Sequence, residues 1–158
     1  MALVKGVNSY ATVAEADAYF ADRLDVAAWT STTPEQKAQA LVTATSVLDD
    51  LQWTGTAISE SQKLAFPRSG QYFDPRVGTK VWLSDTVPTR VINATFEQAY
   101  HLLNNDGLLD NTGTVRDLSI TSIDLIGLRN PNVLSPSAKR QIKAILVNSG
   151  SSNWWRSN

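Results

Sequence analysis

The feature that most constrains the fold of this chain is a repeated signal for the start of a helix. At Thr12, and again at Thr33, a hydroxyl residue is followed three positions later by Glu15 or Gln36. In such a capping box each of the two side chains accepts a hydrogen bond from the backbone N–H of the other residue. Apolar residues then recur at helical spacing. The pattern predicts two helices, 13–25 and 34–51.

Three further positions carry start signals of the same kind. Pro88 and Pro136 each stand at a first helical position, where the missing N–H of proline costs nothing. They predict a long helix that begins at Pro88 and closes at the glycine of 104–107, and a basic helix over 136–148. A third box at 59–62 predicts a short helix that Pro67 must end.

One segment has the period of a strand. Apolar and polar residues alternate over 117–125, which predicts an extended strand of about ten residues. The apolar set is Leu118, Ile120, Ile123 and Leu125. The only other candidate strand is short, at 79–83. Because a lone strand leaves unpaired N–H and C=O groups, we expect a neighbouring copy of the protein to supply the missing edge.

These elements predict a mainly α fold. The expected architecture is a small bundle of four to five helices with one extended arm and a flexible C-terminal tail. We divide the chain into a helical core over 1–107, an extended strand and loop over 108–134, and a basic helix and tail over 135–158.

Composition excludes several classes of protein. The chain has 158 residues and no cysteine, which rules out a disulfide framework and thiolate metal sites. No apolar run approaches the roughly 18 residues of a membrane span. The N-terminal sequence lacks the apolar core of a signal peptide, so we expect neither secretion nor membrane contact.

The near-neutral net charge of −1 hides an asymmetry. Residues 1–124 contain nine Lys or Arg against fifteen Asp or Glu, whereas 125–158 contain five basic residues and no acid. A basic end on an acidic body indicates contact with an acidic partner or with nucleic acid. The alternative is an ordinary solvated basic helix face.

The stretch QKLAFPRSG at 62–70 places apolar residues directly before a proline and an arginine. We expect Leu64 and Phe66 to turn into the core, and Arg68 to remain near the surface. Tyr72, Phe73 and Trp82 then extend a long loop over 70–87. A loop of that length is sometimes functional, but core-covering aromatic residues are the commoner case. We therefore expect these three side chains to cover the core.

No pattern in the chain favours an enzyme. The single histidine, His101, follows Glu97 by four residues, a spacing that commonly stabilises a helix surface. The adjacent Asp49 and Asp50 point about 100° apart on a helix and make a poor metal pair. No phosphate-loop, zinc-protease or calcium-loop motif occurs. We expect no catalytic residue, no metal and no cofactor.

Several segments together resemble a known family. In order they are NSYATVAEADAYFADR, AAW, EQKAQALVTATSVLDDLQWTG, SQKLAFPRSG and VPTRVINATFEQAYHLL, within residues 8–104. The set resembles the head–tail connector adaptors, or head-completion proteins, of tailed bacteriophages. Members of that family are often labelled "putative DnaT-like" single-stranded-DNA-binding proteins.

The resemblance implies a structural virion protein located at the head–tail interface and assembled in the host cytoplasm. It implies a homo-oligomeric ring beneath the portal protein, twelve-fold by family analogy. Such a ring extends the channel for viral DNA and docks the tail or the next connector. By analogy the C-terminal region would contact the portal or a neighbouring subunit. The residues expected to do so are Arg129, Lys139, Arg140, Lys143, Trp154, Trp155 and Arg156.

Two alternatives remain open at the level of sequence. The first is a DnaT-like protein that binds single-stranded DNA, which needs a basic groove and aromatic stacking platforms. The acidic body argues against it, since such a body suits a conduit past which DNA slides. The second is another connector component, a stopper or tail-terminator, which usually contains more strand. The connector adaptor is the interpretation that the sequence favours.

Overall fold

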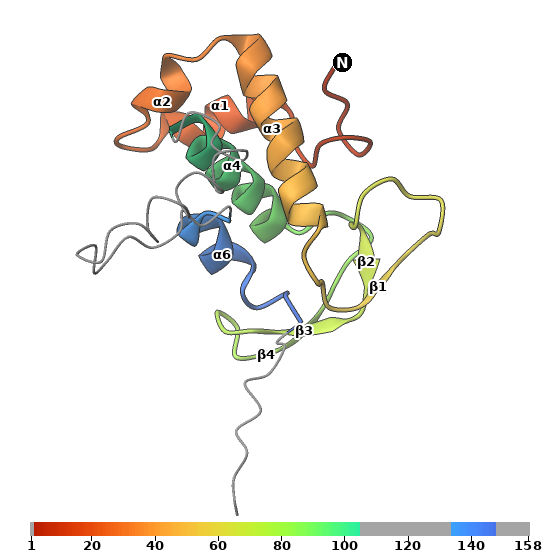
Figure 1. The fold of residues 1–158 in the computed structure, drawn as a ribbon. Coiled ribbons are helices and arrows are strands. Elements are labelled where there is room, and N and C mark those ends of the chain that lie inside the picture. The colour runs from red at the N-terminus through yellow and green to blue at the C-terminus, as the bar shows by residue number, and fades with distance from the viewer. Residues whose placement is uncertain (1, 105–133, 148–158) are drawn as a thin grey trace, which may run out of the picture.

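A computed structural model describes residues 2–104 and 134–147. This part of the chain contains five helices and two small antiparallel sheets (Figure 1). The helices are α1 (Val13–Ala21), α2 (Ala27–Thr30), α3 (Pro34–Asp49), α4 (Thr89–Asn104) and α6 (Pro136–Ile142). The strands are β1 (Thr56–Ala57), β2 (Arg68–Ser69), β3 (Gln71–Asp74) and β4 (Thr79–Trp82), paired β1 with β2 and β3 with β4.

The prediction of a mainly α bundle is wrong, because the fold is mixed α/β. The stretch between α3 and α4, which the sequence pattern assigned to a short helix and a loop, forms both sheets. The short candidate at 79–83 is a real strand, and its partner lies in the same chain. The predicted strand over 117–125, with Leu118, Ile120, Ile123 and Leu125, lies outside the described residues.

The two capping boxes are confirmed. The hydroxyls of Thr12 and Thr33 accept the backbone N–H groups of Glu15 and Gln36, and both boxes close reciprocally. The helix after Thr12 is shorter than predicted, however. It ends at Ala21, and Leu24, an apolar residue within the predicted span of 13–25, is 96% exposed.

Only one of the two hydrogen bonds of the third capping box forms. The side-chain oxygen of Gln62 accepts the backbone N–H of Ser59 at 3.2 Å, as the pattern requires. No helix follows, because the Gln62 amide instead donates to the carbonyls of Leu64 and Pro67, on either side of the cis Phe66–Pro67 peptide bond. A side chain committed to these loop carbonyls stabilises a turn.

Helix α4 runs through the centre of the molecule (Figure 1), and its residues belong to two hydrophobic clusters. Its N-terminal half contributes Val91 and Ala94 to one cluster, and its C-terminal half contributes Phe96, Ala99 and Leu102 to the other. We call the first the sheet-side cluster: Tyr10, Leu48, Trp53, Leu64, Phe66, Leu83, Val91, Ala94, Ala138, Ile142 and Ile145. We call the second the helix-side cluster: Ala11, Ala16, Phe20, Trp29, Ala40, Leu41, Ala44, Phe96, Ala99 and Leu102.

Helix α6 packs against α4 and begins as predicted. The Ser135 hydroxyl caps it, and the backbone N–H of Ser135 donates to the side chain of Gln98 at 2.8 Å. The predicted span of 136–148 is too long, because the α-helix ends at Ile142. The chain then pairs with the segment after α3: Thr54 donates to the Ile145 carbonyl and Val147 to that of Gln52, both at 2.9 Å.

The stretch QKLAFPRSG has a structural role in the fold. Leu64 and Phe66 are buried as predicted, and Phe66 packs edge-on against Trp53 with 4.8 Å between ring centroids. The guanidinium of Arg68 donates to four backbone carbonyls, those of Trp53, Thr54, Gly55 and Ala65. An arginine that satisfies these loop carbonyls fixes the chain where it enters β2.

Two glycines make the junction between the sheets possible. Gly55 has a φ of +80°, and a Cβ there would lie 2.1 Å from the carbonyl oxygen of Ser69. At Gly70 a Cβ would lie 2.9 Å from the Cα of Gly55. Because both residues are glycine, the two backbones can approach this closely, and β2 can lead directly into β3.

Candidate nucleic-acid interface

The β3–β4 hairpin owes its turn to the sequence Asp74-Pro75-Arg76-Val77-Gly78. The Asp74 carbonyl accepts the backbone N–H groups of Val77 and Gly78, and the Asp74 carboxylate accepts that of Arg76 at 2.9 Å. Aspartate at the first position and proline at the second are typical of such a turn. Gly78 supplies the positive φ, +77°, that returns the chain into β4.

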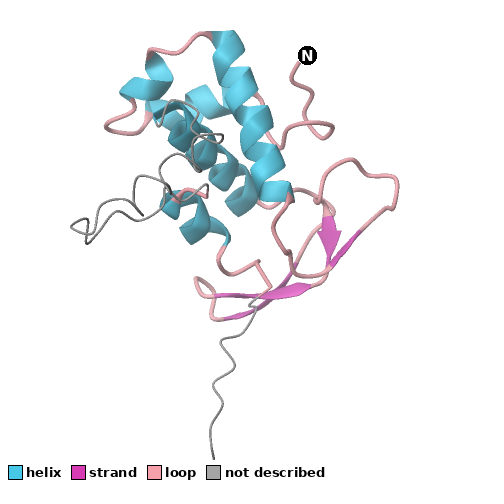
Figure 2. Cartoon of the chain, in the orientation of Figure 1, coloured by secondary structure: helices cyan, strands magenta, loops and turns pink. Residues whose placement is uncertain are grey.

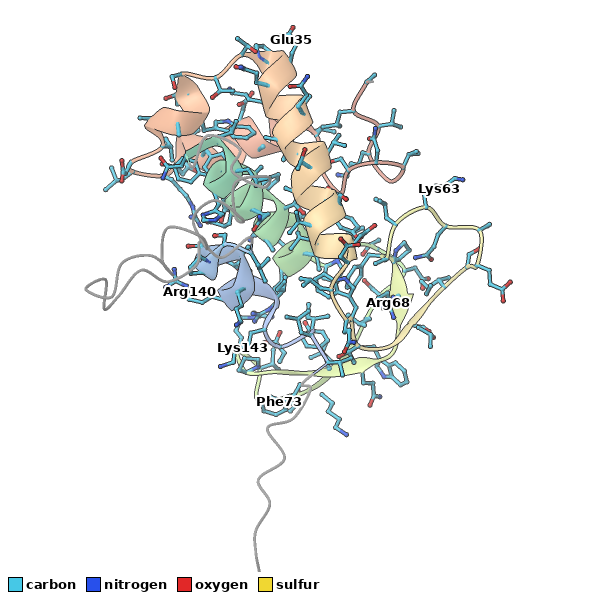
Figure 3. All side chains as sticks on the ribbon, in the orientation of Figure 1. Glu35, Lys63, Arg68, Phe73, Arg140 and Lys143 are labelled. Atoms are coloured by element: carbon cyan, nitrogen blue, oxygen red, sulfur yellow. The ribbon has the colours of Figure 1, made fainter. Side chains whose placement is uncertain are left out.

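The register of the hairpin places two aromatic side chains on its outer face. Gln71 lies opposite Trp82, and Phe73 lies opposite Lys80. Since side chains alternate between the faces of a strand, these four point the same way. We call them the outer face of the hairpin. Phe73 is 56% exposed and Trp82 is 69% exposed, and Figure 3 shows Phe73 pointing away from the helices.

The inner face of the hairpin turns toward the start of α4. Tyr72 packs against the sheet-side cluster, and the buried Asp74 carboxylate accepts a hydrogen bond from the Arg90 guanidinium at 2.9 Å. The backbone N–H of Arg76 holds the pKa of Asp74 below its ordinary value, and the charges of Arg90 and Arg76 act in the same direction. Asp74 therefore stays ionised and anchors the hairpin to α4.

Helix α6 presents basic side chains near the hairpin. Lys139 and Arg140 are adjacent in α6, and Lys143, three residues after Arg140, is its C-cap residue; all three are exposed, whereas Ala138 and Ile142 are buried. We call them the basic face of α6. Among the residues that the structure describes, none of the three forms an ion pair; Arg140 donates to the hydroxyl of Ser137.

The outer face of the hairpin and the basic face of α6 lie at one end of the molecule. Leu83, directly after β4, belongs to the same cluster as Ala138 and Ile142 of α6. Figure 2 shows the strands gathered at the end opposite α1 and α2, and Figure 3 places Lys143 and Phe73 at that end. Unpaired lysines and exposed rings thus occur together.

The structure tests only part of the predicted set of contact residues. It places Lys139, Arg140 and Lys143 on one exposed face, as their spacing indicated. Whether they contact a partner stays a prediction. Four others lie outside the described residues: Arg129, Trp154, Trp155 and Arg156.

The expectation that the aromatic residues at 72–82 cover the core is wrong for Phe73 and Trp82. The predicted loop over 70–87 is a hairpin, and its register turns both rings to solvent. A signal was present in the sequence. The turn motif DPRVG at 74–78 joins two short runs, QYFD and TKVW, that contain the aromatic and β-branched residues typical of strands.

The described residues offer little for metal chemistry. Within 2–104 and 134–147 no group of three or more His, Cys, Asp or Glu side chains could hold a metal ion. In the same residues no helix has the length and apolar character to span a bilayer. The chemistry that this surface can perform is ring stacking and the binding of anions.

The family comparison agrees with this surface. Residues 2–149 match the family described as "Putative DnaT-like ssDNA binding protein". The chain belongs to this family. No curated protein and no solved structure matches the chain.

The match corrects the function that the sequence favoured. The family description names single-stranded DNA, the stated alternative, and gives no support to a head–tail connector adaptor, a portal or tail partner, or a ring. The acidic body was the reason for preferring a conduit. That argument treated residues 1–124 as one acidic body, whereas the fold places acidic side chains and basic side chains without acidic partners at different ends of the described structure. The expected location in virions stays a prediction.

Proposed function

We propose that this protein binds single-stranded DNA through the outer face of the hairpin and the basic face of α6. The observation that carries the proposal is the pair of exposed rings, Phe73 and Trp82, on one face of the hairpin beside Lys80. In this proposal the protein acts by binding and catalyses no reaction.

The two rings have the arrangement that base stacking needs. Phe73 and Trp82 are diagonal neighbours across the β3–β4 ladder, a relation that places side chains roughly 7–8 Å apart. Stacking on an aromatic side chain contributes about 1–3 kcal/mol per base and tolerates any sequence. Duplex DNA hides the faces of its bases, so this surface favours single strands.

The charges nearby supply the phosphate contacts. Lys80 stands between the rings on the outer face, and the basic face of α6 adds three positive charges with no acidic partner in the described residues. Such contacts are independent of sequence and weaken as salt rises. Together, the rings would contact the bases and the cations would contact the phosphates of the same strand.

The opposite end of the molecule would orient the strand. Residues 2–40 carry five acidic and three basic residues. Phosphates are repelled from that surface, and the repulsion acts over about 10 Å at moderate ionic strength. The acidic end therefore restricts DNA to the end with the hairpin.

The test is the double variant Phe73→Ala, Trp82→Ala, measured by fluorescence anisotropy with labelled oligothymidine of about 16 nucleotides. Loss of two stacking contacts is expected to weaken binding by about thirtyfold or more. The matched control is Leu24→Ala, which removes an apolar side chain that is 96% exposed at the acidic end.

Both rings are exposed, so the double variant should melt within a few degrees of the wild type. Wild-type affinity in a folded double variant would contradict the proposed interface. No measurable binding by the wild-type protein at low salt would contradict the proposed function itself.

A further inference from the structure

A cavity of about 390 Å³ opens between the inner face of the hairpin and the start of α4. Trp82 lines it, so the cavity borders the outer face of the hairpin described above. The residues that line it also include Arg76, Arg90, Ser84 and Thr89. A volume of this size lies in the range of small-molecule sites.

Two guanidinium groups meet in this cavity through a shared carboxylate. Arg90 donates to one oxygen of Asp74 at 2.9 Å, and the Arg76 Nε lies 3.9 Å from the other. Asp74 is one negative charge between two positive ones, which leaves the cavity with a net positive charge. Each guanidinium carries five N–H donors, so both have donors to spare.

The remaining polar groups of the cavity suit an anion. Ser84 and Thr89 bring hydroxyl groups, which can donate to an oxyanion, and Ser84 shares a 2.9 Å hydrogen bond with Thr86. Guanidinium forks match the geometry of a phosphate, which can accept two parallel hydrogen bonds. Arg90 is the better placed, because its side chain is only 27% exposed.

We propose that this cavity binds the terminal phosphate of a DNA strand whose last base stacks on Trp82. The inference rests on the proposed function, since the strand must first occupy the outer face of the hairpin. A recess that ends at α4 accommodates a chain end more readily than a continuous strand. The doubly charged terminal phosphate also gains more from two guanidiniums than an internal phosphodiester does.

The experiment compares three oligothymidines of equal length, ending in a 5′-phosphate, a 3′-phosphate or hydroxyls only. Anisotropy titrations of the wild-type protein give the affinity for each. One of the two phosphorylated strands is expected to bind about tenfold more tightly than the hydroxyl-ended strand, the effect of one hydrogen bond to a charged group.

Two variants test whether the cavity is responsible for this gain in affinity. Arg90→Lys keeps the charge beside Asp74 but loses the planar fork, and Thr89→Ala removes one hydroxyl. Both should reduce the preference for the phosphorylated end and leave the affinity for the hydroxyl-ended strand unchanged. Ser31→Ala, an exposed hydroxyl on the far side of the molecule, is the matched control.

The proposed function and this inference fail in different ways. Binding of the hydroxyl-ended strand without a preference for either phosphate overturns the terminal-phosphate site and leaves the stacking surface intact. Equal loss of affinity for all three strands in Arg90→Lys also overturns it, because the cavity would then hold an internal phosphodiester. Failure of every strand to bind overturns both.

Discussion

The two ends of this molecule share one central helix and differ in how they use charge. At the acidic end each of the three basic residues in 2–40 is paired, as Lys5–Glu15, Arg23–Glu97 and Lys37–Asp17. At the other end, within the described residues, Lys80 and the basic face of α6 have no acidic partner.

The difference shows which surface is built for a partner. Where each cation has its own carboxylate, a phosphate adds little. At the hairpin end Lys80 and the basic face of α6 have no carboxylate in the described residues, and Arg76 and Arg90 share the single carboxylate of Asp74, so positive charge is left over for a phosphate. Among the described residues, the exposed aromatic rings follow the same division. Phe20 and Trp29 fill the helix-side cluster, while Phe73 and Trp82 face solvent beside the unpaired lysines.

The largest effect should come from emptying either cluster. Phe66→Ala in the sheet-side cluster and Phe20→Ala in the helix-side cluster each remove a buried ring, at a cost of about 3–5 kcal/mol in unfolding free energy. Because α4 belongs to both clusters, we expect one cooperative transition in each variant. Urea denaturation followed by circular dichroism and by tryptophan fluorescence measures this. Transitions that differ between the two probes would show that the ends unfold independently.

The next effect concerns the unpaired charges. Replacing Lys139, Arg140 and Lys143 by alanine should lower the slope of log affinity against log salt by about 2, at roughly 0.7 per phosphate contact. The measurement is anisotropy with oligothymidine across a salt series. The matched triple variant replaces Lys5, Lys37 and Lys63, which removes the same net charge elsewhere. An equal loss of slope in both triples would mean that only net charge matters.

A smaller effect is expected from the helix caps. Thr33→Ala and Ser135→Ala each remove a hydroxyl that caps a helix, at a cost of about 1 kcal/mol. Only Ser135 holds the helix with the basic face. We therefore expect Ser135→Ala to weaken DNA binding and Thr33→Ala to leave it unchanged, under conditions where both variants are folded. Equal affinities would indicate that α6 keeps its position without the cap.

The smallest effect is a difference in how Asp49 and Asp74 change the stability of the protein with pH. Burial raises the pKa of Asp49 above its ordinary value of 3.8, while the Arg76 N–H lowers that of Asp74. The contribution of Asp49 is therefore present at low pH and lost as pH rises through its raised pKa. That of Asp74 is present above 3.8 and lost as pH falls through its lowered pKa.

The two asparagine variants should then show opposite trends in urea denaturation from about pH 3 to about pH 7. Relative to the wild type, Asp49→Asn should gain stability as pH rises, because asparagine still accepts from Tyr10 and Ala65 without burying a charge. Asp74→Asn should lose the least stability relative to the wild type at the lowest pH of the range. Parallel curves for the two variants would contradict this assignment.

Much of the helical framework could be predicted from the sequence. Thr12, Thr33 and Ser135 marked helix starts because a cap is a local interaction between neighbouring residues. Ser59 shows the limit of that reasoning. Gln62 accepts the backbone N–H of Ser59 as the box requires, yet the same side chain also donates to the Leu64 carbonyl, and no local pattern reveals which interaction prevails.

The candidate site was harder to predict for the same reason. Lys139, Arg140 and Lys143 stood out because their spacing defines a helix face on its own. Phe73 and Trp82 did not, since a ring in a short strand without clear alternation fits a buried face or an exposed one equally well. The choice depends on which side of the hairpin meets α4, through Asp74 and Arg90.

The sequence by itself determined where helices begin, which of their faces are apolar and how many charges of each sign the chain carries. All of these depend on residues a few positions apart. Only the tertiary structure decided that the segment between α3 and α4 becomes two sheets. It also decided that Lys80 and the basic face of α6, which have no acidic partner in the described residues, lie at the hairpin end, and that two rings meet solvent there beside a positive cavity. Those outcomes depend on contacts between residues far apart in the chain, whose energies no local pattern contains.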